Sequence, residues 1–104
     1  MADRFDPIDE MVANYRAEVD RVRATIHAEI DADARATQAQ QLPRDVPEPM
    51  RARLEVELAA IKADSAARAI LAHARVDAFF AERWTAQLLE FEMMRRDHDG
   101  APMH

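Results

Sequence analysis

The segment Gln41-Leu42-Pro43-Arg44-Asp45-Val46-Pro47-Glu48-Pro49 decides the fold, because it places three prolines within seven residues. Proline lacks an amide hydrogen and clashes with the preceding helical turn, so no helix runs through this stretch. The flanking sequences are rich in Ala, Arg, Glu and Gln, which favour helix. We therefore predict an all-α, single-domain antiparallel helical hairpin. Its helices are residues 7–41 and 50–97, with a Pro-rich turn at 42–49 and a short tail at 98–104.

The first helix has a clear start signal and a single apolar seam. Asp6 is a suitable N-cap, and Pro7 fits the first helical position. Large apolar residues then recur at alternating spacings of three and four, which is typical of a coiled-coil seam. The seam residues of this helix are Phe5, Ile8, Val12, Tyr15, Val19, Val22 and Ile26.

The second half of the second helix, from Val76 to Met94, is apolar on more than one side. Asp45 and Glu48 resemble a capping pair before it, and Gly100 and Pro102 are stop signals after it. The seam is predicted to continue on this helix through Leu54, Leu58, Ile61, Phe79, Phe80 and Trp84. We expect the combined seam to hold a coiled-coil-like homo-oligomer, as a bundle or a ring.

The end of the second helix is predicted to dock a partner. With a tight turn near residue 45 and about 1.5 Å of rise per residue in each helix, Phe5 would lie opposite about residue 85. The rest of the second helix would then have no partner in its own chain. Since burial of one large apolar side chain is worth about 1.5–3 kcal/mol, we expect another chain to cover it. The docking segment is residues 77–96, and its contact residues are Leu88, Leu89, Phe91, Met93 and Met94.

Composition excludes several classes of protein. The chain has 104 residues, no cysteine, one glycine and a net charge of −6. A disulfide framework and a glycine-rich phosphate loop are therefore excluded, and the acidic balance disfavours nucleic acid and anionic membranes as main partners. Apolar runs are far shorter than the about 20 residues that span a bilayer. We expect a bacterial, cytoplasmic protein that is not an enzyme and needs no cofactor.

The histidines do not suggest a metal or catalytic site. His27 precedes Asp31 by four residues, and His73 precedes Asp77 by four, so each pair shares one helix face. With the tight turn, His27 would lie near residue 63 and away from His73. We therefore expect two separate solvated surface pairs.

Three arginines near the turn are candidate phosphate contacts. Arg44, Arg51 and Arg53 gather there, and basic side chains in such a group bind phosphate oxygens. Acidic residues are interleaved with them, so we expect nucleic-acid binding to be weak and non-specific at most.

The chain resembles the oligomerisation core of phage-type small terminases, including those of gene transfer agents, over roughly residues 7–97. The resemblance rests on the seam from Phe5 to Ile26, the turn at Pro43–Pro49 and the apolar C-terminal helix. In that family, helical hairpins pack into a ring and a C-terminal segment engages the large ATPase–nuclease subunit. The resemblance thus implies a DNA-packaging adaptor, although this sequence departs from the family in having no helix-turn-helix domain.

Three functional hypotheses follow from the sequence. The first is a non-enzymatic oligomeric scaffold or adaptor that recruits a larger protein through residues 77–96. The second is a non-catalytic accessory subunit of a multi-subunit enzyme. The third is a helical bundle that binds nucleic acid weakly through the arginines at the turn.

Overall fold

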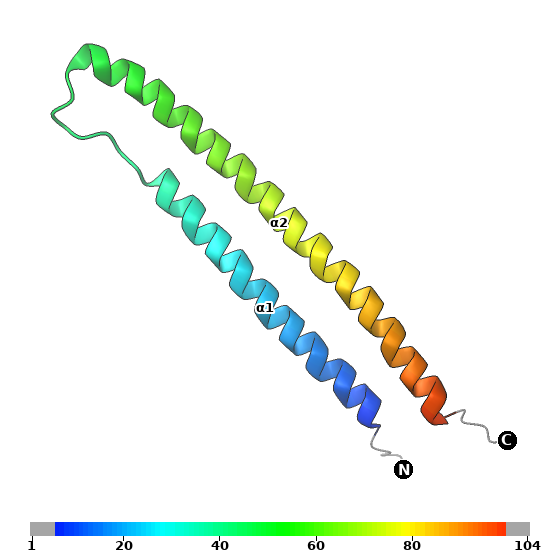
Figure 1. The fold of residues 1–104 in the computed structure, drawn as a ribbon. Helices are drawn as coiled ribbons and strands as arrows, with labels where there is room; N and C mark the ends of the chain where they lie inside the picture. The colour runs from blue at the N-terminus through cyan, green and yellow to red at the C-terminus, as the bar shows by residue number, and fades with distance from the viewer. Residues whose placement is uncertain (1–5, 100–104) are drawn as a thin grey trace. The chain divides into compact units, whose positions relative to one another are not determined.

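The computed structural model describes residues 6–99, which form two helices joined by residues 39–47 (Figure 1). Helix α1 is Pro7–Gln38 and helix α2 is Glu48–Asp99. No strand occurs within residues 6–99, so the all-α prediction is confirmed. No helix in that range is both long and apolar enough to cross a bilayer.

The helix boundaries differ from the predicted ones by two or three residues. Helix α1 ends at Gln38 rather than at residue 41, because the Gln40 amide turns back to the Thr37 carbonyl at 3.1 Å in a tightened last turn. Helix α2 begins before Pro49, which is tolerated in a first turn because its missing N–H would have no helical acceptor. Asp45 consequently lies in the turn and not at the helix start. Phe5 and the predicted tail from Gly100 onward lie outside the described residues.

The chain divides into two compact units, and both helices contribute to each. Unit 1 combines Met1–Ala24 with Asp77–His104, of which residues 6–24 and 77–99 are described. Unit 2 is Thr25–Val76. Each unit is an antiparallel helix pair, since in each one the contacts run in opposite directions along α1 and α2.

In unit 1, Asp6 caps α1 as predicted. Its Oδ1 accepts a hydrogen bond from the Ile8 amide at 2.9 Å, and its carbonyl accepts the Glu10 amide at 3.2 Å. Partial loss of water raises the pKa of Asp6, but hydrogen bonds from the Ile8 and Asp9 amides and the nearby Arg95 guanidinium outweigh that effect. The pKa of Asp6 therefore lies below its ordinary value of 3.8.

This lowered pKa makes the stability of unit 1 depend on pH in the acidic range. A carboxyl with a depressed folded-state pKa stabilises the fold fully above its unfolded pKa, and the contribution is lost as the pH falls through the folded value. Asp6→Asn keeps a capping side chain but removes the titration. We expect the wild type to lose more thermal stability than Asp6→Asn when the pH falls from neutral to below 3.8. Equal losses in the two proteins, followed by circular dichroism, would argue against the assigned role.

The core of unit 1 is aromatic and small. Ile8 and Phe91 are its buried apolar residues, with 7% and 5% of their surfaces exposed. The Tyr15 ring stacks on Trp84 with centroids 5.5 Å apart, and meets the edge of Phe91 at 6.0 Å. Tyr15 thus lies opposite Trp84, close to where Phe5 was predicted to lie. The register between the two helices therefore differs from the predicted one by about ten residues. The prediction that the end of α2 has no partner in its own chain is therefore wrong.

The connection in unit 2 explains this register. The Arg51 guanidinium donates to the Pro43 carbonyl at 2.6 Å, so residues 39–47 fold back beside the first turns of α2. The end of α1 meets α2 only farther along, where the Gln38 side-chain amide donates to the Lys62 carbonyl at 2.8 Å. Prolines favour extended backbone, so residues 39–43 run beside α2 before the chain turns at Arg44 and Asp45, and the end of α1 does not lie opposite the start of α2.

Candidate functional site

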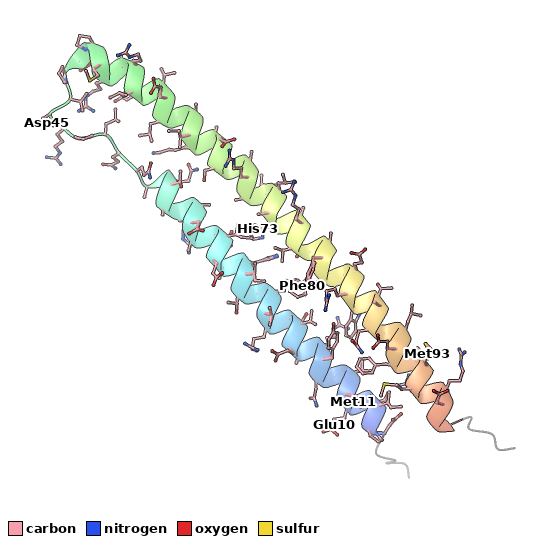
Figure 2. All side chains as sticks on the ribbon, viewed as in Figure 1. Glu10, Met11, Asp45, His73, Phe80 and Met93 are labelled. Carbon is pink, nitrogen blue, oxygen red and sulfur yellow. The ribbon has the colours of Figure 1, made fainter. Side chains whose placement is uncertain are left out.

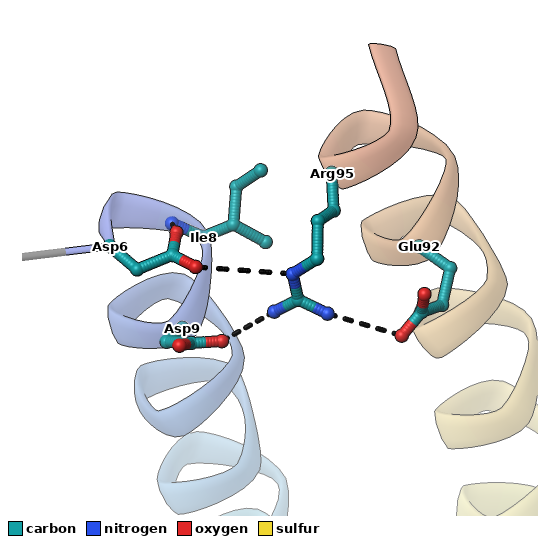
Figure 3. A network of polar contacts seen from close by, with 5 residues as sticks. All are labelled: Asp6, Ile8, Asp9, Glu92 and Arg95. Carbon is teal, nitrogen blue, oxygen red and sulfur yellow. Dashed lines mark hydrogen bonds and ion pairs between the residues drawn. The ribbon is translucent and has the colours of Figure 1, made fainter. Parts of the chain in front are cut away.

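Arg95 joins the end of α2 to the beginning of α1 in unit 1 (Figure 3). Its guanidinium pairs with Asp9, lies 3.9 Å from the Asp6 carboxylate through Nε, and donates to Glu92 at 3.1 Å. A single exposed ion pair contributes only about 0–1 kcal/mol to stability. One guanidinium shared by three carboxylates, however, restricts how the two helix ends lie against each other. The network therefore positions the C-terminal part of α2 against α1.

The apolar residues of the predicted docking segment lie on two sides of α2. Phe80, Trp84 and Leu88 are half-buried and Phe91 is buried, so these four belong to the side that packs within the unit. The other side is exposed: Leu89 and Met93 show 62% and 61% of their surfaces. Met94 and Phe79 are exposed as well. Figure 2 shows Met93 on the side of α2 away from α1.

Phe91 is therefore not available to a docking partner, because Tyr15 of the same chain covers it. The exposed members of the predicted contact set are Leu89, Met93 and Met94, and Leu88 is half-covered. That they contact another protein stays a prediction.

The predicted oligomer seam is largely occupied by packing within the chain. Ile8 is buried, and most of the other seam residues are half-buried, namely Val12, Tyr15, Val19, Val22, Ile26, Leu54, Leu58, Phe80 and Trp84. Ile61 and Phe79 are exposed. Because the two helices already cover most of this seam, its role between chains stays a prediction.

A shallow groove lies between the two helices of unit 1. It has a volume of about 220 Å³ and is lined by Val19 and Arg16 of α1 and by Phe80 and Trp84 of α2. The Arg16 guanidinium lies 5.7 Å from the centre of the Trp84 ring, a cation–π arrangement. Opposite charges, Arg23 and Asp77, are 3.7 Å apart at its edge. The groove is thus lined by charges of both signs and does not select a ligand of one charge.

In unit 2, two histidines and one aspartate come together. The His27 and His73 rings are 4.2 Å apart and nearly perpendicular, and His73 Nε2 lies 2.7 Å from the Asp31 carboxylate. His73 lies on the side of α2 that faces α1 (Figure 2). The prediction of two separate same-helix pairs is wrong, because the ten-residue difference in register brings His73 level with residues 27–31. The described residues include no group of three or more His, Cys, Asp or Glu arranged to hold a metal ion.

The contact between Asp31 and His73 is expected to stabilise unit 2. It is a half-exposed hydrogen bond between helices, so Asp31→Ala should lower the free energy of unfolding by roughly 0.5–1.5 kcal/mol. Asp33→Ala is a matched control, because Asp33 is exposed two residues away on the same helix. Urea titrations of both variants test this assignment. An equal effect of the two substitutions would show that the contact contributes nothing specific.

The three arginines at the turn have different surroundings. Arg51 is mostly covered, and it donates to the Pro43 carbonyl and lies 3.7 Å from Glu55. Arg44 and Arg53 are exposed. Arg51 therefore holds the connection in place, and phosphate binding by this group stays a prediction.

Comparison of the chain with protein-family models, with curated proteins and with solved structures found no match.

Sequence reasoning missed two features of the structure. One is the contact between His27 and His73, which depends on a register that spacing alone does not give. The other is a set of exposed apolar residues on α2 in unit 2, where Val56 and Ile70 show 71% and 72% of their surfaces. The signal for the second was present, because apolar and small residues recur there at helical spacing on a side different from the one that holds Leu54 and Leu58.

Proposed function

We propose that the chain is a non-enzymatic helical scaffold or adaptor that self-associates and recruits a larger protein. The recruiting surface is the exposed side of α2 in unit 1, which carries Leu89 and Met93. The observation that carries the proposal is the exposure of Leu89 and Met93 beside a core of very few buried apolar residues. Large aliphatic and thioether side chains at helical spacing are suited to a partner's apolar groove. Their position next to the Arg95 network gives the partner a firmly held surface.

The distribution of exposed apolar residues favours α2 as the contact helix. Of the ten large apolar residues that are exposed among those described, nine are on α2 and only Met11 is on α1. Contiguous exposed apolar surface marks interaction sites more often than single scattered residues do.

The most concrete form of the proposal is a DNA-packaging adaptor similar to small terminases. Its support is the architectural resemblance, a two-helix core with an apolar C-terminal segment. In this form the recruited protein would be the large ATPase–nuclease subunit.

Capture of a binding partner tests the proposal. A tagged chain is expected to retain a larger protein in a fixed ratio, and the variant Leu89→Asp/Met93→Asp is expected to lose it completely with unchanged helicity. Each substitution places a charge in an interface where it would be desolvated without a counter-charge. The control variant Ala17→Asp/Ala24→Asp adds the same two charges on exposed positions of α1 in the same unit. Retention by the Leu89/Met93 variant would contradict the proposal.

A further inference from the structure

One side of α2 in unit 2 is apolar and lacks a covering helix within the unit. The half-buried positions of this part of α2 mark the side that packs on α1 and on the connection, and they include Leu54, Leu58 and Val76. A second apolar row lies on other positions of the helix and is exposed. We call this row the outer face of α2, and it consists of Val56, Ala60, Ala63, Ala67, Ile70, Leu71 and Ala74.

The outer face has the composition of a helix-packing surface. Apart from the adjacent pair Ile70 and Leu71, its successive positions are three or four residues apart, which keeps them on one side of a helix. Val56, Ile70 and Leu71 are large exposed apolar side chains. Burial of such surface is favourable roughly in proportion to the apolar area removed from water. The alanines between them allow the axis of a second helix to approach to about 8 Å, the close end of helix packing. In α1, no large apolar residue of the described segment 25–38 is exposed, so α2 carries this feature alone.

Four charged residues lie along one flank of the outer face between residues 56 and 76, and Arg53 precedes them on the same side of the helix. Glu57, Asp64, Arg68 and Arg75 are exposed and are separated by seven, four and seven residues, so they share one side of the helix. Asp64 and Arg68 pair with each other at 2.8 Å.

The order of these charges is antisymmetric. Glu57 and Arg75 are each nine residues from Ala66, and Asp64 and Arg68 are each two residues from it. Reversal of the helix about Ala66 therefore exchanges each of these four charges for one of opposite sign.

We propose that two copies of the chain pair through the outer faces of α2, antiparallel and centred near Ala66. In an antiparallel two-fold pair, each flank meets the same flank of the other copy in the reverse direction. Glu57 of one copy then lies opposite Arg75 of the other, and Asp64 lies opposite Arg68. In a parallel pair, the charged flank would instead meet the opposite flank, which carries Ala59 and Ala66. Lys62 is the one Lys, Arg, Asp or Glu on that flank between residues 57 and 75, so most of the four charges would have no counter-charge. Charge complementarity therefore favours a second copy of the chain as the partner that covers the outer face. It also favours the antiparallel direction for that copy.

This inference rests on the self-association in the proposed function and supplies its geometry. It uses unit 2 alone, whereas the recruited protein is proposed to bind unit 1.

Disulfide trapping tests the direction of the pair, and the absence of cysteine from the chain makes single-cysteine variants unambiguous. Ala67→Cys is expected to form a disulfide dimer, because residue 67 lies almost level with itself across a centre near Ala66. Val56→Cys alone is expected to form none, since its two copies would be about 30 Å apart at 1.5 Å per residue. A mixture of Val56→Cys and Ala74→Cys should give the mixed dimer. A dimer of Val56→Cys with itself, or none of Ala67→Cys, would overturn the proposal.

Charge reversal gives a second test that keeps the apolar residues intact. Glu57→Arg and Arg75→Glu are each expected to weaken self-association at low salt by about tenfold, because each places like charges opposite one another twice. The double variant Glu57→Arg/Arg75→Glu should return to the wild-type value. Failure of the double variant to recover would contradict the antiparallel pairing.

The wild-type mass separates failure of this inference from failure of the proposed function. If the unmodified chain is oligomeric and yet Ala67→Cys is not trapped, only the antiparallel geometry is wrong. If the unmodified chain is monomeric, both the antiparallel pairing and the self-association in the proposed function are wrong.

Discussion

Replacement of Phe91 by alanine is expected to lower the free energy of unfolding by about 3–5 kcal/mol, which is the usual loss for a buried aromatic side chain. Phe91 is the most buried large residue among those described in unit 1, and its ring lies in a T-shaped contact with Tyr15. The substitution removes apolar burial and leaves a cavity that two helices cannot easily close. In a chain of this size such a loss is a large part of the total stability.

Phe79→Ala is the matched control, because it makes the same chemical change at a side chain with 52% of its surface exposed. Its effect is expected to stay below about 1 kcal/mol. Urea unfolding at one protein concentration, followed by circular dichroism and by the fluorescence of Trp84, measures both variants. Trp84 is the only tryptophan and lies in unit 1, so its emission reports on this core. Similar losses at the two positions would show that Phe91 is not the core residue.

Tyr15→Ala is expected to have the second-largest effect, about 2–4 kcal/mol, because one ring supports two others. Tyr15 stacks on Trp84 and also contacts Phe91, so its loss exposes both. Tyr15→Phe keeps both ring contacts and is expected to change stability by less than about 0.5 kcal/mol. Since Tyr15 and Phe91 touch, the double alanine variant should lose less than the sum of the single losses.

These effects depend on the register of the two helices. With a tight turn at residue 45, Tyr15 would lie opposite about residue 75, given equal rise in both helices. Phe91 would then be a surface residue, and its replacement would cost little. Additive effects of Tyr15→Ala and Phe91→Ala in urea titrations would contradict the contact between them.

Local signals in the sequence were sufficient to predict the helices. Asp6 and Pro7 mark a start that the structure confirms, because each acts within one helical turn. The prolines of residues 43–49 separate the helices for an equally local reason, namely the missing amide hydrogen.

The register was not predictable in the same way. It depends on how residues 39–47 lie against α2, and this is set by contacts such as that between Arg51 and the Pro43 carbonyl. The proximity of His27 to His73 follows from the register and was missed with it. The expectation that Phe91 docks a partner failed for the same reason.

The outer face of α2 was not predicted, because the seam expected for this part of the helix uses one side only, through Leu54, Leu58 and Ile61. Alanine gives a weak apolar signal, so the sequence alone does not distinguish the row that connects Val56 to Ile70. The structure separates this row from the side that packs within the unit, since the two differ in exposure.

We propose that association covers the exposed apolar sides of α2, and the absolute mass of the purified chain tests this proposal. Light scattering after size exclusion, across a dilution series, is expected to give at least twice the chain mass of 11.8 kDa. A mass of many copies would further support the ring-forming, terminase-like form of the proposal. A stable, helical species of 11.8 kDa at every concentration would contradict the account.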